Sequence, residues 1–465
     1  MAIASTDPTT GELLKSFDEI SDQELDSRLT AAWNTFQSYR LTEFSERARW
    51  MRAAADILDT EREQVATLMT QEMGKTIVAS RQEVEKCAKT CRFFADEAEG
   101  FLADERADAQ ATGAVEAYVT YQPLGPVLAV MPWNFPLWQA MRFAAPALMA
   151  GNVGLLKHAS NVPQTALFMQ DLFERAGFPK GVFQTLLISA RRVEGVLDDR
   201  RVVAATLTGS GPAGSAVASA AGRNIKKTVL ELGGTDPFIV MPSADVRRAA
   251  EVATTARLIN NGQSCINAKR FIAHSDVFEE FRDRFVEGMA SKVVGDPLDE
   301  RTDVGPLASE QQLHDISGIV DDAVSKGASV LCGGKPLDRP GYFFPPTVLT
   351  DVVPGMRAHL EEVFGPVATL YRVSGIDEAI ALANGTELGL GANVWTEDAK
   401  ERARFVRDIS SGMVFINGNT TSFPELPFGG VRSSGYGREL SSHGIKEFCN
   451  AKTVWVGKGS SFSTE

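Results

Sequence analysis

One cysteine of this sequence, Cys265, lies in a polar stretch, NNGQSCINAKR, between an amphipathic helical segment and an apolar strand. A thiol in such a turn is either a nucleophile or a small side chain that fills a gap. Glu231 lies near the end of the earlier apolar run TVLEL, and Gly233 and Gly234 follow this run, which predicts an open strand end that solvent or substrate reaches. A thiol that forms a thioester and a carboxylate that deprotonates water make a pair for covalent catalysis.

A glycine-rich segment, GSGPAG at residues 209–214, follows the apolar run VVAATLT and precedes an alanine-rich helical segment. In this context backbone N–H groups are expected to hold a pyrophosphate, and the alternative is a tight turn whose glycines serve packing alone. The same pattern places an acid about 20 residues later on a ribose hydroxyl, and Glu231 occupies that position. Glu231 is therefore either a cofactor ligand or a general base.

The composition is that of a globular chain, with 465 residues and a net charge of −13. This acidic balance disfavours the broad basic surface that binds nucleic acid or anionic membranes. No run approaches the roughly 18 apolar residues of a membrane span, and no secretory leader pattern begins the sequence, so we expect a cytoplasmic protein. The five cysteines form neither a disulfide framework nor a CxxC metal pair, and we expect no metal site and buried packing for Cys87 and Cys91.

The order of segments along the chain predicts the fold class. Residues 22–102 have the periodicity of amphipathic helices, and the polar link ADERADAQATG ends this block. From Ala117 onward short apolar runs alternate with helical segments, and a second such series covers residues 268–420, which predicts two doubly wound α/β domains. The apolar tail KTVWV has no evident partner in its own domain, and we expect it to pair across an oligomer interface.

Seven short motifs, in one order along nearly the whole chain, resemble those of the aldehyde dehydrogenase superfamily. None suffices by itself, but their order and spacing together are specific. Further details of the sequence are most similar to the succinate semialdehyde dehydrogenase branch. The motifs are MPWNFP at 131–136, LLKHAS at 155–160, LTGS at 207–210, LELGG at 230–234, GQSC at 262–265, EEVFGPV at 361–367 and PFGG at 427–430.

The resemblance implies a domain organisation as well as an α/β fold. It implies a Rossmann-like cofactor domain at residues 1–110 and 126–228 and a catalytic domain at 229–425. A small β oligomerisation arm is expected at 111–125 and 450–465, and residues 426–449 are expected to return to the cofactor domain. A homodimer or a homotetramer is the implied assembly.

The resemblance also implies the catalytic roles. Cys265 is the expected nucleophile, and its attack on an aldehyde gives a thiohemiacetal and then a thioester. The Asn134 amide and the Cys265 N–H are the expected donors to the oxyanion. Glu231 becomes the general base for hydrolysis, which removes its interpretation as a ribose ligand. A helix cap for the segment that follows is the alternative role for Asn134, and the two roles are compatible.

The implied oxidant is NADP, with some use of NAD. Lys157 is expected to bind the adenine ribose, and Ser160 stands where NAD-preferring relatives often have a glutamate that repels a 2′-phosphate. The alternative for Ser160 is a cap on the next helix. The other expected cofactor contacts are Gly209 and Ser210 at the phosphates, the Trp133 backbone, and Glu362 and Phe364 at the nicotinamide end.

Arg142 and Ser422 are the residues expected to bind the substrate. Arg142 lies two helical turns after Asn134, and in the resembled branch an arginine and a serine at these places clamp a substrate carboxylate. A surface salt bridge is the alternative for Arg142. The implied reaction is oxidation of a small aldehyde that carries a carboxylate, succinate semialdehyde to succinate. The alternatives are a broad-specificity aldehyde dehydrogenase and a non-catalytic binding protein of the same fold.

Overall fold

Fully apolar strands form the centre of the first lobe of the molecule. In the computed structural model, which describes residues 3–458, β5 (Pro126–Met131) and β6 (Val153–His158) are almost wholly buried. Such runs belong to parallel sheets with both faces covered. The six-stranded sheet is parallel except for β19, and its order is β19 (Gly435–Tyr436), β9 (Lys227–Glu231), β8 (Ala204–Thr208), β5, β6 and β7 (Phe183–Thr185).

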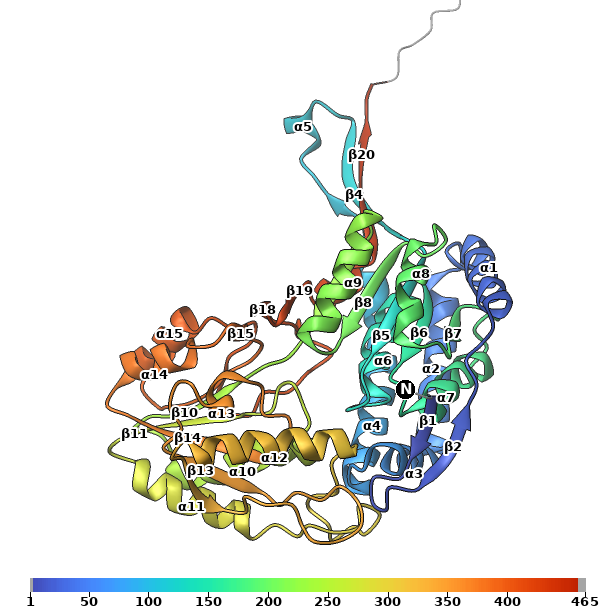
Figure 1. The fold of residues 1–465 in the computed structure, drawn as a ribbon. Helices are drawn as coiled ribbons and strands as arrows, with labels where there is room; N and C mark the ends of the chain where they lie inside the picture. Colours follow the sequence, from blue (N-terminus) through green and yellow to red (C-terminus); the bar gives the residue numbers. More distant parts are fainter. Residues whose placement is uncertain (1–2, 459–465) are drawn as a thin grey trace, which may run out of the picture.

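Helices surround this sheet, and the predicted helical block at residues 22–102 is confirmed. Figure 1 shows the block in blue at the outer side of the lobe. The hydroxyls of Ser21 and Thr76 cap the first and last helices of the block, because each accepts a backbone N–H of the first turn. The helices are α1 (Asp22–Tyr39), α2 (Phe44–Thr60), α3 (Arg62–Met73), α4 (Ile77–Phe101), α6 (Trp138–Met149), α7 (Pro163–Arg175), α8 (Val193–Asp198) and α9 (Gly211–Arg223).

The second lobe contains a seven-stranded sheet whose residues alternate between two apolar cores. Phe238 packs with α10 (Val246–Leu258) and α11 (Phe278–Ala290), and the next residue, Ile239, faces the core of α12 (Glu310–Ser325) and α14 (Ile376–Ala383). The strand order is β12 (Ser329–Cys332), β13 (Thr347–Thr350), β14 (Val367–Val373), β11 (Arg270–His274), β10 (Pro237–Val240), β16 (Asn393–Trp395) and β17 (Phe415–Ile416).

A three-stranded arm projects from the first lobe (Figure 1). In it β20 (Cys449–Val456) pairs antiparallel with β4 (Glu116–Pro123), which also pairs with β3 (Glu105–Arg106). The sequence showed no evident partner for KTVWV in its own domain, and the structure shows that β4 of the same chain pairs with it. The segment expected to be a mere link contributes β3 and the short α5 (Ala109–Thr112). Residues 459–465 of the expected arm lie outside the described residues.

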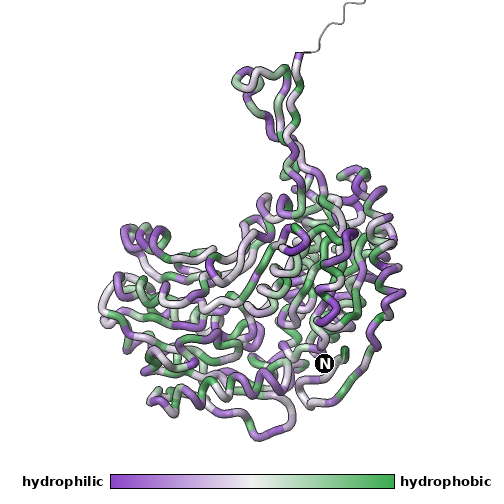
Figure 2. The backbone as a smooth tube through the Cα atoms, turned by 45° about the horizontal axis from the view of Figure 1, so that its top comes forward, coloured by the Kyte–Doolittle hydropathy of each residue, from purple (hydrophilic) through white to green (hydrophobic). Residues whose placement is uncertain are grey.

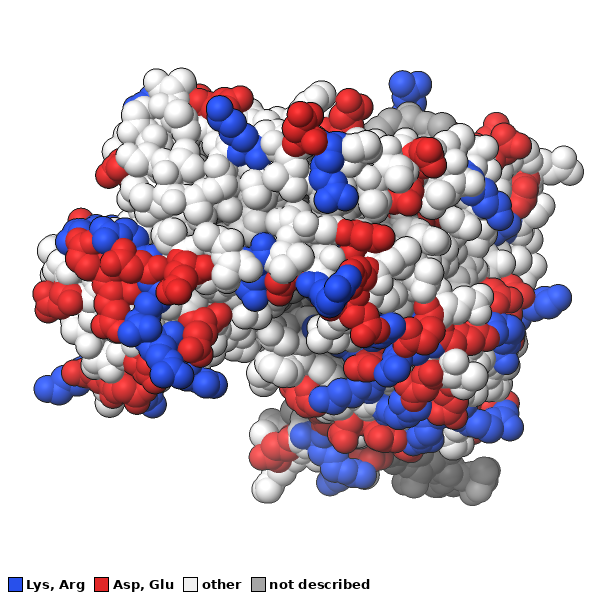
Figure 3. All heavy atoms as spheres, turned by 90° about the horizontal axis from the view of Figure 1, so that it is seen from below, with Lys and Arg blue, Asp and Glu red and all other residues white. Residues whose placement is uncertain are grey.

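The distribution of side chains agrees with this layering. Figure 2 shows hydrophobic backbone segments inside both lobes and hydrophilic segments on the outer turns. On the face in Figure 3 acidic and basic side chains are interspersed. Cys87 and Cys91 are buried in α4, as expected, and Cys91 contacts Met141. Within residues 3–458 no helix combines the length and apolar character that crossing a membrane requires.

Candidate active site

The loop that carries Cys265 joins α10 to β11 and has an unusual backbone. Asn260, Asn261 and Gly262 have φ values of 57°, 57° and 76°, in the left-handed region. Asparagine and glycine tolerate this region better than other residues do. A Cβ on Gly262 would collide with the carbonyl of Gly365, so this position requires glycine. The asparagine amides donate to backbone carbonyls, and the turn therefore fixes the position of Cys265.

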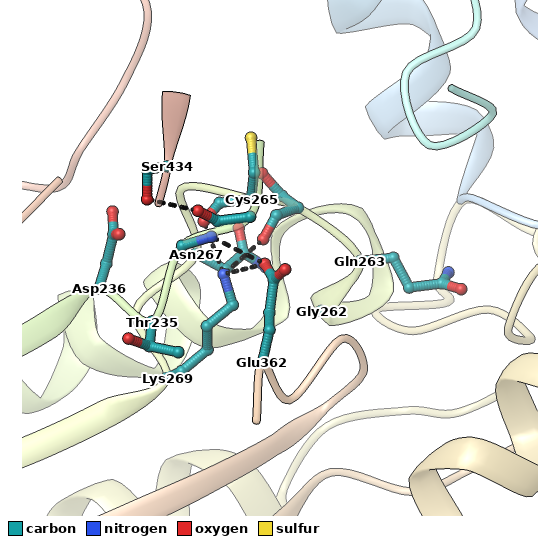
Figure 4. Close-up of polar contacts among 12 residues, drawn as sticks. Thr235, Asp236, Gly262, Gln263, Cys265, Asn267, Lys269, Glu362 and Ser434 are labelled. Carbon is teal, nitrogen blue, oxygen red and sulfur yellow. Dashed lines mark hydrogen bonds and ion pairs between the residues drawn. The ribbon is translucent and has the colours of Figure 1, made fainter. Parts of the chain in front are cut away.

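Lys269 lies below the same loop and was not among the predicted site residues. Its ammonium donates to the carbonyls of Ser264 and Cys265 at 2.9 and 2.6 Å and pairs with Glu362 at 3.1 Å. In Figure 4 these contacts converge on the amino group, and the Cys265 sulfur points away from it. Two ammonium hydrogens are thus used by the loop, and the ion pair connects the loop to Glu362. A lysine four residues after the cysteine, at the entry to a buried strand, is the sequence signal for this contact.

Cys265 stands in the wall between two cavities. One has a volume of about 160 Å³ and is lined by residues of α4, α6, the cysteine loop and residues 420–422. The other has a volume of about 440 Å³ and is lined by residues of the 131–136 loop, the glycine-rich turn and the 361–364 segment. We call them the small chamber and the large cleft. Gln139 is the other side chain that lines both.

The small chamber contains both predicted substrate residues. Arg142 is buried, its Nε forms an ion pair with Glu439, and its Nη2 donates to Thr208 at 3.3 Å. The interpretation of Arg142 as a surface salt bridge is wrong, because the pair is buried. Ser422 is also buried and accepts a hydrogen bond of 2.6 Å from Lys86, a residue that the motifs did not indicate.

The large cleft contains five of the seven predicted cofactor residues. The indole of Trp133 and the ring of Phe364 meet edge to face, with their centroids 5.7 Å apart. The five residues that line the cleft are Trp133, Gly209, Ser210, Glu362 and Phe364, and the further lining includes Arg357 and Gln312.

The glycines of residues 209–214 have different functions. A Cβ on Gly211 would meet nothing within 4 Å, and one on Gly209 would make only an ordinary contact at 3.5 Å. A Cβ on Gly214 would lie 2.7 Å from Leu232, so this glycine serves packing. The open space at the first two positions favours close approach of a ligand over the packing-only alternative, and the turn leads into the N-terminus of α9.

The remaining two predicted cofactor residues lie outside the cleft lining. Lys157 is buried at the end of β6, and burial lowers the pKa of its ammonium. The Ser160 carbonyl accepts a hydrogen bond from Ala4 at 2.9 Å. The residue at the N-cap of α7 is Val162, and no side chain at this position caps the helix. The alternative role of Ser160 as a helix cap is therefore not observed.

Glu231 is more enclosed than the sequence predicted. Only 2% of Glu231 is exposed, because β19 pairs with its strand and the Gly429 backbone covers its carboxyl group. The expectation of an open strand end is therefore wrong. Within residues 3–458 neither carboxyl oxygen has a hydrogen-bond partner. Burial and the nearby Glu439 carboxylate raise the pKa of Glu231 well above its usual range. This shift favours the neutral carboxyl over the carboxylate. Glu231 does not line the large cleft as a ribose ligand would.

The Asn134 side chain lies in the large cleft near the cysteine loop. Its amide donates to the Gln263 carbonyl at 3.1 Å, which leaves the second amide hydrogen for another acceptor. The alternative role as a helix cap is not observed. Instead Glu83, itself paired with buried Lys75, accepts the N–H groups of Leu137 and Trp138 at 2.8 Å.

The thiol of Cys265 is in its protonated form in this structure. Burial raises its pKa to about 12, although the cations of Arg142 and Lys269 act in the opposite direction. Among the described residues, no three His, Cys, Asp or Glu side chains are grouped as a metal site requires.

A family model for the aldehyde dehydrogenase family matches residues 1–454 of the sequence. The chain belongs to the aldehyde dehydrogenase family. Among its similar proteins is a succinate-semialdehyde dehydrogenase [NADP(+)] 1 of Mycobacterium ulcerans, which is 61% identical over 458 residues and covers 98% of this chain and 100% of its own. The protein of that name from Mycobacterium tuberculosis is 60% identical over 456 residues, with the same two coverages.

Solved structures of family members have the same fold. A succinic semialdehyde dehydrogenase from Streptococcus pyogenes, in complex with NADP+, is 37% identical, with a TM-score of 0.95 over 98% of this chain and 100% of its own. A succinate-semialdehyde dehydrogenase from Burkholderia pseudomallei is 34% identical and also has a TM-score of 0.95, over 98% of this chain and 95% of its own. The predicted fold class and the resemblance are thereby confirmed.

Proposed function

We propose that this chain oxidises succinate semialdehyde to succinate, with NADP+ as the preferred oxidant and NAD+ as a poorer one. The observation that carries the proposal is the position of Cys265 between a small polar chamber and a large cleft with an open glycine turn. The names of the similar mycobacterial proteins and of the Streptococcus pyogenes structure support the same substrate and cofactor.

The residues around Cys265 suit the steps of this reaction. The thiol gives its proton to solvent, and the thiolate attacks the aldehyde carbon. The Asn134 amide and the Cys265 N–H donate to the oxyanion that forms. When bound, NADP+ supplies the acceptor for the hydride that leaves this carbon. Glu231 then removes a proton from the water that attacks the thioester, which releases the acid and restores the thiol. Glu231 acts in this step in its ionised form, after it has given its own proton to solvent. It then returns the proton of the water to the departing thiolate.

The two ends of the substrate have separate contacts in the proposed complex. The aldehyde reaches Cys265, and Ser422 and Arg142 contact the carboxylate at the far end of the small chamber. In the large cleft Gly209 and Ser210 hold the cofactor phosphates, and Trp133, Glu362 and Phe364 hold the nicotinamide end. Lys157 and Ser160 lie beyond this lining, where the adenosine end would extend.

Initial rates with a panel of aldehydes and both cofactors test the proposed function. The panel contains succinate semialdehyde, the uncharged butanal and an aromatic aldehyde. We expect the highest kcat/KM for succinate semialdehyde with NADP+. Equal kcat/KM values across the panel would instead identify a broad-specificity aldehyde dehydrogenase, and no turnover of any member would support a non-catalytic protein.

Replacing Ser160 by glutamate is expected to shift cofactor preference toward NAD+. The added carboxylate repels a 2′-phosphate and accepts ribose hydroxyls, so the ratio of kcat/KM for NADP+ to that for NAD+ should fall by roughly tenfold or more. Ser160→Gln, which adds the same bulk without charge, is the matched control. An equal fall in both variants would attribute the change to size and contradict the electrostatic explanation.

Two further proposals concern the assembly and location of the protein. We propose a homodimer or homotetramer whose interface includes the arm, because β20 is an edge strand of its sheet and Trp455 and Val456 are 55% and 41% exposed on it. We also place the protein in the cytoplasm, which suits five free thiols in one chain.

A further inference from the structure

Arg142 already has an acidic partner inside the protein. Its Nε is paired with the Glu439 carboxylate, and its guanidinium lies 4.2 Å from the centre of the Phe428 ring. A buried ion pair of this kind resists separation, because either partner left alone would carry an uncompensated charge. Glu439 therefore holds the Arg142 guanidinium in place, and Arg142 is less free than an unpaired cation to form an ion pair with a substrate anion.

Lys86 is the cation of the chamber that has no anionic partner. Among residues 3–458 no carboxylate lies within 4 Å of its ammonium. The neighbouring charges on α4 are already engaged, because Glu83 pairs with Lys75 and Lys89 with Glu425. Burial, reinforced by the repulsion of Arg142, lowers the pKa of Lys86 to about 8. This ammonium is still mostly protonated at neutral pH. An anion placed beside it would stabilise its charge against burial and against the repulsion of Arg142.

The geometry around Lys86 leaves donors available for that anion. The ammonium lies 4.3 Å from the centre of the Trp138 ring and donates to the Ser422 hydroxyl at 2.6 Å. Of its three hydrogens one is thus used by Ser422, and the aromatic face takes part of its charge. Ser422 accepts this hydrogen bond, so its own hydrogen remains free to donate. One free ammonium N–H and one free hydroxyl are the donors that the two oxygens of a carboxylate require.

Resting on the function proposed above, we propose that Lys86 is the specificity-determining cation that pairs with the substrate carboxylate, beside the hydrogen-bond donors of Ser422 and Arg142. Lys86 and Ser422 line the same chamber as Cys265. A short chain with an aldehyde at one end and a carboxylate at the other joins the thiol to this pair. An uncharged aldehyde of the same length leaves the ammonium unpaired and binds more weakly.

The variant Lys86→Met tests this proposal, because methionine keeps the apolar stem against Trp138 and removes the charge. We expect the kcat/KM for succinate semialdehyde to fall roughly 30- to 100-fold through KM, and that for butanal to fall far less. Lys86→Arg, which restores a cation, should recover part of the loss. Lys89→Met is the matched control, since Lys89 lies one turn later on α4, outside the chamber, and should leave both substrates unaffected.

Inhibition of butanal oxidation by succinate separates a failure of this inference from a failure of the proposed function. If Lys86 binds the carboxylate, Lys86→Met weakens this inhibition by a similar factor, even if another aldehyde is the true substrate. Equal losses for both aldehydes, or unchanged inhibition by succinate, would overturn the role of Lys86. A selective loss in Arg142→Gln with none in Lys86→Met would show that Arg142, and not Lys86, supplies the ion pair with the carboxylate.

Discussion

Cys265→Ala is expected to lower aldehyde oxidation by roughly four orders of magnitude or more, because covalent catalysis then has no nucleophile. Among the described residues no other cysteine lines the small chamber or the large cleft. The loop itself should persist, since its shape depends on Gly262 and on the contacts of Lys269 with two carbonyls. The measurement is the rate of NADPH formation, together with cofactor binding, which should survive the substitution.

Cys449→Ala is the matched control for the thiol. Burial raises the pKa of Cys449 to about 12, as it does for Cys265, but Cys449 lies outside both cavities and donates to the Ile445 carbonyl. Its replacement should leave turnover unchanged. Comparable activity in both alanine variants would show that Cys265 only fills space.

The protonated thiol also predicts a pH dependence. With a pKa of about 12, the thiolate fraction of Cys265 in the free enzyme rises about tenfold for each pH unit through the neutral range. Alkylation of Cys265 by iodoacetamide should therefore accelerate with pH and reach no plateau before the protein unfolds. A plateau near neutral pH would instead reveal a thiolate already poised for attack.

Glu231→Gln is expected to stop the reaction after its first half. Glutamine keeps the shape of the buried side chain but accepts no proton from water, so steady-state turnover should fall roughly 10²- to 10⁴-fold. A burst of about one NADPH per subunit should persist, since Cys265 and the oxyanion donors are unchanged. Rapid mixing followed by mass analysis of the Cys265 peptide should detect the trapped acyl group.

The environment of Glu231 defines the controls for this experiment. Glu439 faces it with a second carboxyl group, so removing one acid should not lower the thermal stability of the fold. Glu362→Gln changes an acid of the large cleft and should slow the burst itself. Unchanged turnover in Glu231→Gln, with weaker cofactor binding, would restore the ribose interpretation.

Most of the correct predictions of local structure came from motifs whose residues are adjacent in the sequence. Gly262, Asn260 and Cys265 lie in one loop, and the glycine-rich turn lies between one strand and one helix, so their local order determines their geometry. The alternation of strands and helices likewise predicted both sheets. Local patterns are informative here because the backbone of each turn depends on its own residues.

Contacts between distant segments were not predictable in this way. Lys86 and Ser422 are separated by 336 positions, and Tyr121 and Ala451 face each other across β4 and β20. The enclosure of Glu231 has the same origin, because β19 covers it from the far end of the chain. Such pairs are determined by how distant segments pack in the folded chain. The position of a lysine on a helix does not indicate which distant residue it contacts.

The position of Cys265 as the partition between two cavities has a consequence for the traffic of ligands. In the proposed complex the aldehyde and its acid product would occupy the small chamber and the cofactor the large cleft, so neither would have to pass the other. We expect the lifetime of the thioester on Cys265 to determine the order in which the two products leave. At Cys265 only a hydride would then pass from the small chamber to the large cleft, and no whole molecule would cross.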